Sequence, residues 1–222
     1  MKCDFCDERK GTQTVYNLVY GRYDRIVYET ENFVVFPCMG QLREGHLLIA
    51  SKKHYNAVGQ LDDFLLIELD SILNKACCFI KKEYGKMSIV FEHGVLEDDG
   101  KTGGCGIYHL HLHIIPAEKD EVQDVFERLQ EQKTNDMHIV NGLKDTTHYV
   151  QNNQTYVFCG QSTEDGLLSA YIITNDNNYF ESQYMRKIVA NVFGKYDWNW
   201  KNNKDPEHEL LSTAEKAKRY FK

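Results

Sequence analysis

The segment 109–114 reads HLHLHI, so His109, His111 and His113 stand at alternate positions and apolar residues fill the gaps. In a β-strand, alternate side chains point to opposite faces, and each residue advances the chain by about 3.3 Å. The three imidazoles therefore line one face about 6.6 Å apart, while the apolar residues enter the core. Near neutral pH, a histidine can act as a nucleophile, a proton carrier or a metal ligand. The spacing predicts a half-buried strand whose polar face carries chemistry.

Two other interpretations of this strand are open. An ordinary solvent-facing strand is the simplest, but such faces usually carry Thr, Lys or Glu, and three of the nine histidines gather within five positions here. A single metal ion held by all three histidines is the second. Imidazoles about 6.6 Å apart along one strand do not converge easily on one ion with bonds of about 2 Å. One histidine as a metal ligand and another as a catalyst is geometrically easier.

Cys3 and Cys6 form a second group, a C-x-x-C pair near the N-terminus. By itself this pair indicates a redox couple, half of a zinc site or a coincidence. A redox couple is typical of a thioredoxin-like βαβ setting, which the sequence does not suggest. A tetrahedral zinc site needs two further ligands. The chain carries seven cysteines and no apolar run typical of a signal peptide or a transmembrane helix, so we expect reduced thiols and a cytoplasmic location.

The composition is that of an ordinary globular protein, with 222 residues, 42% of them hydrophobic and 27% charged. This length favours one core domain with a substantial extension. The formal net charge of -7 argues against a protein that binds nucleic acid polymers or an anionic membrane through bulk attraction. A small anionic ligand held by a few local donors remains compatible with it.

Hydrophobic periodicity gives the elements that must position these residues. The order of strands followed by helices predicts an α+β fold. We expect a mostly antiparallel sheet of about five strands with a long helix packed on it over residues 1–118, and an α/β extension over 119–222. The expected strands are 25–29, 33–37, 46–50, 87–93, the histidine strand, 155–160 and 167–174, and the expected helices are 61–84, 119–132, 181–193 and 206–221.

The segment HLHLHII fits the pattern His-φ-His-φ-His-φ-φ, where φ is apolar, and so resembles the histidine triad (HIT) family of nucleotide hydrolases and transferases. EGHLLIASKKHYNAVGQL at 44–61, the N-terminal CDFC, and VFEHG with GGCGIYH within 90–109 also resemble segments of this family. ESQYMRK and DWNW are similar to the extension of its dinucleotide-hydrolase-like branch. The resemblance is strong over 3–116 and looser over 117–222, and it implies a HIT-like fold and a nucleotide as the small-molecule partner.

The resemblance implies that His111 is a nucleophile that attacks the α-phosphorus of a nucleotide, while His113 contacts phosphate oxygens or the leaving group. A neutral imidazole with a pKa near 6.5 can serve both as nucleophile and as leaving group. Water as second acceptor gives a hydrolase of dinucleoside polyphosphates or nucleoside phosphoramidates. Phosphate or a sugar phosphate as acceptor gives a phosphorylase or nucleotidyltransferase. Transferase branches often carry Gln at the last triad position, so His113 favours hydrolysis; a non-catalytic nucleotide- or zinc-binding module is a further alternative.

Phosphate binding needs donors, and glycines let backbone amides approach a phosphate closely. Most relatives carry Gln and Ser at two positions of the loop before the histidine strand, where this chain has Cys and Gly, so backbone amides are expected to serve. Arg186 is either a phosphate ligand, because a guanidinium matches phosphate geometry, or an ordinary surface arginine. The candidate phosphate-binding residues are Gly104, Cys105, Gly106, His93 and Arg186.

Phe5 and Phe36 match positions that flank the base in the family, although isolated aromatic residues are more often part of a core. Relatives usually place Asp or Asn at the position of Cys38 to bind the ribose hydroxyls. A thiol is a weak partner for a diol, so sugar recognition is expected to differ here. His46 is expected beside the triad, unless it is an ordinary strand histidine.

The resemblance extends to a metal. Some triad proteins, and galactose-1-phosphate uridylyltransferase, complete a zinc site with residues that correspond to Cys3, Cys6, His54 and His109. This match implies a structural zinc ion with a closed coordination shell, which braces the N-terminus against the histidine strand. Relatives commonly dimerise, so a homodimer is possible, unless the extension replaces the partner.

Overall fold

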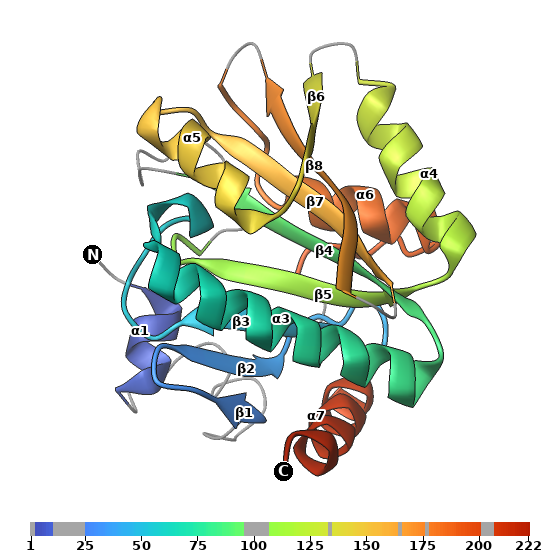
Figure 1. Cartoon of the computed structure of the whole chain (residues 1–222). Helices are drawn as coiled ribbons and strands as arrows, with labels where there is room; N and C mark the ends of the chain where they lie inside the picture. The colour runs from blue at the N-terminus through green and yellow to red at the C-terminus, as the bar shows by residue number, and fades with distance from the viewer. Residues whose placement is uncertain are drawn as a thin grey trace.

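The computed structural model describes residues 3–10, 25–95, 107–132, 135–163, 166–175, 178–200 and 207–222. These residues form one eight-stranded sheet with helices on both of its faces (Figure 1). This mixture of helices and antiparallel strands confirms the α+β class. None of the helices within these ranges is both long enough and apolar enough to cross a bilayer.

The strands follow one another in the order β1-β2-β3-β5-β4-β7-β8-β6, and every neighbouring pair is antiparallel. The histidine strand β5 therefore lies in the interior of the sheet, between β3 and β4. The strands are β1 (Tyr28–Glu29), β2 (Phe33–Pro37), β3 (Leu47–Ser51), β4 (Met87–Gly94), β5 (His111–Ala117), β6 (Asn135–Val140), β7 (Tyr156–Thr163) and β8 (Gly166–Asn175).

Three of the helices, α3, α5 and α7, cover the face of the sheet that is turned to the viewer in Figure 1. Helices α1, α4 and α6 contribute to the clusters on the opposite face. The helices are α1 (Asp4–Arg9), α3 (Asp63–Tyr84), α4 (Lys119–Gln130), α5 (Thr146–Gln151), α6 (Tyr184–Val192) and α7 (Glu207–Phe221), with the 3₁₀ turns η1 (Val58–Gln60) and η2 (Leu143–Asp145).

The long helix α3 is the main cover of the first face. Its buried residues recur every three or four positions between Leu66 and Ile80, as an amphipathic helix requires. It begins two residues later than the apolar pattern suggested, because the Asp62 side chain caps it by accepting a hydrogen bond from the Leu65 amide at 2.9 Å. Gly85 ends it in the left-handed conformation, with φ of 68°.

The apolar residues of the histidine strand enter the core under α3, as predicted. Leu110, Leu112 and Ile114 are fully buried there. On the opposite face, one apolar cluster lies under α4 and α6, and another joins α1 to β2 and β3. His113 stacks on Phe91 of the first cluster, and His111 meets Phe5 of the second edge to face. The polar face of β5 thus lies at the junction of two apolar clusters.

The extension continues the same sheet. β4 pairs with β7 from Ser88 opposite Ser162 to Gly94 opposite Tyr156, so the sheet crosses the expected boundary at residues 118 and 119. The division into domains 1–118 and 119–222 stays a prediction. Sequence periodicity did not indicate α1, β6 or α5, because these elements are short and depend on tertiary contacts.

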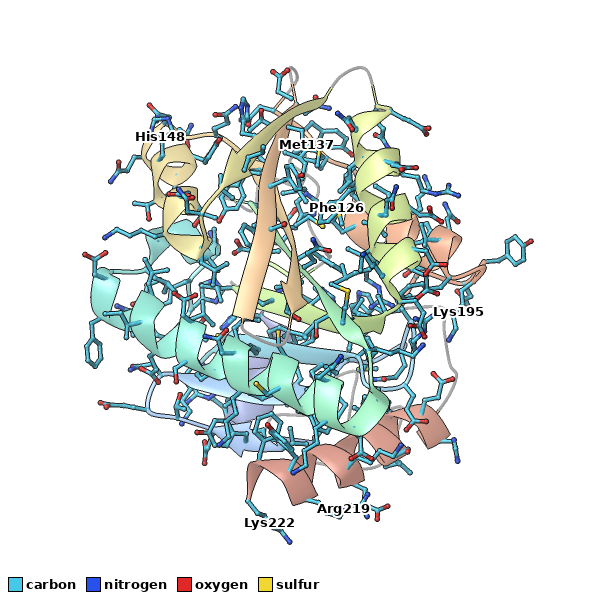
Figure 2. All side chains as sticks on the ribbon, turned by 45° about the vertical axis from the view of Figure 1, so that its right-hand side comes forward. Phe126, Met137, His148, Lys195, Arg219 and Lys222 are labelled. Atoms are coloured by element: carbon cyan, nitrogen blue, oxygen red, sulfur yellow. The ribbon has the colours of Figure 1, made fainter. Side chains whose placement is uncertain are left out.

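Helix α7 packs beside α3 and β2. It buries an apolar stripe that includes Leu210 and Phe221, and the ring of Phe221 stacks on Tyr28 with centroids 5.1 Å apart. Arg219 and Lys222 are exposed and point away from the body (Figure 2). Thr213 is the polar member of the buried face of α7, with no exposed surface.

Glu92 of β4 is a buried carboxyl group that joins three elements. One oxygen accepts a hydrogen bond from the Val58 amide of η1 at 2.6 Å, and the other accepts one from the Tyr156 hydroxyl of β7 at 2.8 Å. Burial raises the pKa of Glu92 to about 7. The folded-state pKa thus lies above the unfolded-state value of about 4.3.

The free energy of unfolding should therefore fall as the pH rises from about 4 through 7, since only the unfolded state loses this proton freely. In Glu92→Gln the amide oxygen can still accept from the Val58 amide, the amide nitrogen can donate to the Tyr156 hydroxyl in place of the bond that this hydroxyl donated, and the titration is removed. We expect the variant to be more stable than the wild type at pH 8, by up to about 3 kcal/mol. Denaturant unfolding at pH 5 and pH 8 measures this, with Glu31→Gln at an exposed carboxyl as the control. An unchanged pH slope in Glu92→Gln would contradict the assignment.

Candidate functional site

The pairing of the strands sets the positions around the triad. Ala50 and Leu48 of β3 lie opposite His111 and His113, and Phe91 of β4 lies on the other side of His113. His109 comes just before β5, where the chain is still a bend. All three imidazoles lie on the face opposite α3, as the alternation predicted.

The orientation of the His111 ring is fixed by one short hydrogen bond. Its Nδ1–H donates to the backbone carbonyl of His109 at 2.6 Å. Because a neutral imidazole carries one proton, Nε2 keeps its lone pair. Burial chiefly lowers the pKa of His111 to about 4, so the ring is neutral at pH 7. The site therefore presents an uncharged imidazole with a free ring nitrogen.

The ring of His113 is held between His46 and Phe91. His46 Nε2 and His113 Nδ1 are 2.8 Å apart, and the His113 ring stacks on Phe91 with centroids separated by 4.3 Å. His113 Nε2 is buried and has no hydrogen-bond partner among the described residues. Burial is the largest cause that holds the pKa of His113 well below its usual value, so this ring is also neutral.

His93 of β4 lies on the same face. It is 7% exposed, meets Phe180 edge to face at 5.6 Å, and burial lowers its pKa to about 3. Neither of its ring nitrogens has a hydrogen-bond partner within the described ranges. Buried polar atoms without partners are costly, so a polar ligand that bonded to those of His93 and His113 would remove this cost.

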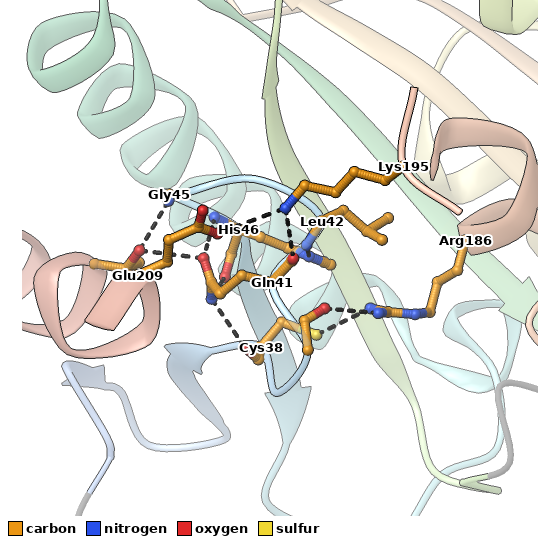
Figure 3. Close-up of polar contacts among 10 residues, drawn as sticks. Cys38, Gln41, Leu42, Gly45, His46, Arg186, Lys195 and Glu209 are labelled. Atoms are coloured by element: carbon orange, nitrogen blue, oxygen red, sulfur yellow. Dashed lines mark hydrogen bonds and ion pairs between the residues drawn. The ribbon is translucent and has the colours of Figure 1, made fainter. Parts of the chain in front are cut away.

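Arg186 of α6 is 1% exposed, which rules out the surface arginine that was one of its two sequence interpretations. Its guanidinium donates to the carbonyls of Gly40 at 2.7 Å and Trp198 at 3.0 Å. It also donates to the sulfur of Cys38 at 3.3 Å (Figure 3). None of these partners is an anion. The positive charge of Arg186 also contributes to the lowered pKa values of His46 and His113.

Cys38, His46 and His113 place their ligand atoms within 4.8 Å of one another, which raises the question of a metal. The two histidines already contact each other at 2.8 Å through their ring nitrogens, and the Arg186 guanidinium sits on the sulfur. A fixed positive charge opposes a cation at this place. The three residues act as part of a hydrogen-bond network.

Phe5 and Phe36 line a cavity beside β2 and β3. Their rings meet edge to face, with centroids 5.3 Å apart. Phe5 also contacts the ring of His111, with centroids 5.4 Å apart, so one wall of the cavity lies against the histidine strand. A mostly apolar cavity with a few polar groups is typical of a small-molecule site. Its lining residues are Phe5, Glu8, Arg9, Ile26, Val34, Phe36, Ala50 and Ser51.

Cys3, Cys6, His54 and His109 bring their ligand atoms within 4.8 Å of one another. The sulfur-to-nitrogen distances are 3.3 Å from Cys3 to His109, 3.4 Å from Cys6 to His54 and 3.5 Å from Cys6 to His109. Tetrahedral zinc, with bonds of about 2.3 Å to sulfur and 2.0 Å to nitrogen, would separate such atoms by about 3.5 Å.

The protonation of His109 also suits a metal ligand. Its Nε2 lies 2.7 Å from the carbonyl of Ser51 and donates its proton there, which leaves Nδ1 free to face the two cysteines. Burial lowers the pKa of His109 to about 4, which favours the neutral imidazole that a metal requires. The donor set and its spacing fit zinc.

The HIT domain model matches residues 21–120. An uncharacterized HIT-like protein of Chlamydia trachomatis is 32% identical over 93 residues, which cover 40% of this chain and 77% of that protein. This chain belongs to the HIT family. Protein hit of Bacillus subtilis is 29% identical over 90 residues, and the chain spans 59% of its length. A zinc-bound histidine triad protein from Mycobacterium smegmatis is similar over 54% of this chain and 77% of its own, with a TM-score of 0.34 and 18% identity.

The HIT match includes His54 and the whole histidine strand but ends before β6, so several contacts of the site come from outside it. Arg186 and Thr213 both belong to the extension. The sequence-predicted residues fall into three groups, the four candidate metal ligands, the histidine cluster with Arg186 and Cys38, and the aromatic cavity. Gly104, Cys105 and Gly106 lie outside the described residues.

Sequence reasoning missed Gln41, a fully buried residue between β2 and β3. It lies in a loop where a glutamine is unremarkable, so no local signal identified it. Thr213 was also missed, although a hydroxyl within the apolar stripe of α7 is a usable sign of a buried hydrogen bond.

Proposed function

We propose that this HIT protein is a nucleotide hydrolase that cleaves a dinucleoside polyphosphate or a nucleoside phosphoramidate through a covalent nucleotidyl-His111 intermediate. The observation that carries the proposal is the hydrogen bond from His111 Nδ1–H to the His109 carbonyl. It leaves Nε2 with its lone pair. It also supports the positive charge that the ring gains when Nε2 becomes bonded to phosphorus.

The reaction has two displacements. In the first, His111 Nε2 attacks the α-phosphorus, an N–P bond forms, and the P–O or P–N bond to the leaving group breaks with its electron pair. A phosphate leaving group departs as an anion, and an amine takes its proton from solvent. In the second, the oxygen of water attacks phosphorus, the N–P bond breaks, and one proton of the water is released. The products are a nucleoside monophosphate and the leaving group, with His111 unchanged.

His113 and Arg186 supply the electrostatic part of the proposal. A partnerless donor at His113 Nε2 suits a phosphate oxygen, and His93 is a second candidate for the same role. Arg186 brings a fixed positive charge close to these neutral rings without a carboxylate within 4 Å in the described ranges. A phosphate would supply that missing negative charge, which favours its binding.

The aromatic cavity suits the base, because Phe5 and Phe36 offer ring surface beside His111. Cys38 offers only a thiol to the sugar, and that thiol already accepts from Arg186. We therefore expect weak discrimination at the sugar hydroxyls.

Cys3, Cys6, His54 and His109 would hold a structural zinc ion. Four protein ligands leave no open position for water, so the ion would tie α1, and with it Phe5, to the histidine strand. Cytoplasmic location and homodimer formation stay predictions.

A nucleotidyltransferase or phosphorylase would share the intermediate and differ in its second acceptor. Incubation with diadenosine polyphosphate or adenosine phosphoramidate, followed by product analysis and intact mass of acid-quenched protein, separates the candidates. Hydrolysis predicts a nucleotidyl mass increase on the protein and turnover in water alone. Turnover that requires added phosphate would indicate a phosphorylase. Neither turnover nor the mass increase on any such substrate would indicate a binding module.

A further inference from the structure

A buried chain of hydrogen bonds runs from the last helix of the protein to the triad. It links Thr213 of α7, Gln41 of the loop between β2 and β3, His46 and His113. The exposed fractions of these four side chains are 0%, 0%, 0% and 2%. Thr213 and Gln41 have no place in the reaction described above, and Thr213 lies outside the HIT match at residues 21–120.

Gln41 holds the backbone of His46 from both sides (Figure 3). Its Nε2 donates to the carbonyls of Cys38 at 2.8 Å and His46 at 2.9 Å. Its Oε1 accepts from the His46 amide at 3.2 Å. Since a side-chain amide has one accepting and one donating end, these contacts fix which way the Gln41 amide points.

Thr213 completes this arrangement from α7. Its hydroxyl accepts from the Gly45 amide at 2.8 Å and lies 3.2 Å from Gln41 Oε1. Because Oε1 can only accept, the hydroxyl proton of Thr213 must point to it. Gly45 has φ of +96°, and a Cβ there would come within 2.7 Å of Pro116 and Tyr84, so this turn has one tightly packed conformation.

The direction of the remaining bonds follows from the backbone. The Leu42 amide donates to His46 Nδ1, at 3.4 Å, so the proton of the neutral His46 ring is on Nε2. His46 Nε2–H then donates to His113 Nδ1 at 2.8 Å. A neutral His113 that accepts at Nδ1 must carry its own proton on Nε2, the buried atom without a partner.

We propose that Thr213 and Gln41 are positioning residues that lock His46, and through it His113, in the tautomer with Nε2–H directed into the site. The kinetic part of this inference rests on the proposed function. It gives the C-terminal extension a task, which is to orient the hydrogen-bond donor that a triad in the first half of the chain offers to a phosphate oxygen.

The decisive variant is Thr213→Val, which keeps the shape of the side chain and removes the hydroxyl. Thr213→Ser keeps the hydroxyl. Ser212→Ala is the matched control. The Ser212 hydroxyl joins the same helix to the same loop by donating to the Glu44 carboxylate at 2.7 Å, outside the chain of hydrogen bonds that links Thr213 to His113. Ring ¹⁵N shifts of the protein report the tautomer of His113 without any substrate.

We expect the wild type, Thr213→Ser and Ser212→Ala to show His113 with its proton on Nε2. Thr213→Val should show a mixture of tautomers and a fall in kcat of about tenfold, with KM nearly unchanged, since a donor used in the transition state is lost. Should Thr213→Val fail to fold, the spectra of Thr213→Ala and of the wild type still test whether the Thr213 hydroxyl sets the tautomer of His113.

A wild-type His113 protonated on Nδ1 would overturn the proposal. So would a Thr213→Val protein whose His113 spectrum matches that of Ser212→Ala. If the wild type turns over no nucleotide, the proposed function fails, while the tautomer measurements still test whether Thr213 and Gln41 position His46 and His113.

Discussion

Replacement of His111 with alanine is expected to abolish turnover of the nucleotide substrate. The variant loses the Nε2 lone pair of His111, which is left free because this ring donates through Nδ1 to the His109 carbonyl at 2.6 Å. Loss of a covalent nucleophile typically costs a factor of about 10⁴ or more in kcat. Steady-state kinetics with the preferred dinucleoside polyphosphate or phosphoramidate measure this loss, and the nucleotidyl mass increase should vanish with it.

His138→Ala is the control for this prediction, because His138 is an exposed residue of the edge strand β6. It should retain wild-type kinetics. His111→Ala should still bind the nucleotide, because the aromatic cavity and Arg186 remain, and the rise in its melting temperature on adding nucleotide measures this binding. If His111→Ala keeps more than a tenth of the wild-type kcat, the covalent route is wrong.

Removal of the zinc ligands is expected to have the largest effect on stability. Cys6→Ser should leave three of the four ligands and lose the ion, and with it the tie between α1 and His109. A ligand present at about 1,000 times its Kd stabilises the folded state by about 4 kcal/mol, so a loss of this order is expected. For a protein of this size, that corresponds to a fall in Tm of about 8–16 °C.

Elemental analysis and thermal unfolding, each with and without a chelator, test this prediction. The wild type should contain one zinc ion per chain and lose stability in the chelator, while Cys6→Ser should contain none and be insensitive to it. Cys78→Ser, at an exposed cysteine of α3, is the matched control and should behave as the wild type. A wild-type protein that contains no zinc, and whose melting temperature is the same with and without chelator, would contradict the zinc assignment.

The sequence by itself determined the part of the site that depends on local periodicity. Alternation along residues 109–114 predicted both the histidine face and the buried Leu110, Leu112 and Ile114, because side chains of a strand must alternate. Helix α3 followed from apolar residues at helical spacing. The four candidate metal ligands also followed from the sequence, although only through their resemblance to family members, since they lie up to 106 positions apart.

Only the tertiary structure showed which residues of the extension reach the histidine cluster. Arg186 reads as a surface arginine as readily as a ligand, and its burial follows from the packing of α6 and Trp198 against the loop at Gly40. Likewise, no pattern in the sequence links Thr213 to Gln41 across 172 positions.

The sequence predicted some features and not others because the interactions that determine them act over different distances along the chain. Strand alternation and helical spacing are set by neighbouring residues, so they can be read along the chain. The protonation state of His46 and His113 depends on burial and on single hydrogen bonds between distant segments, whose partners are defined only once the sheet has closed around them. A sequence therefore names the chemical groups, and the fold decides which of their atoms carry the protons.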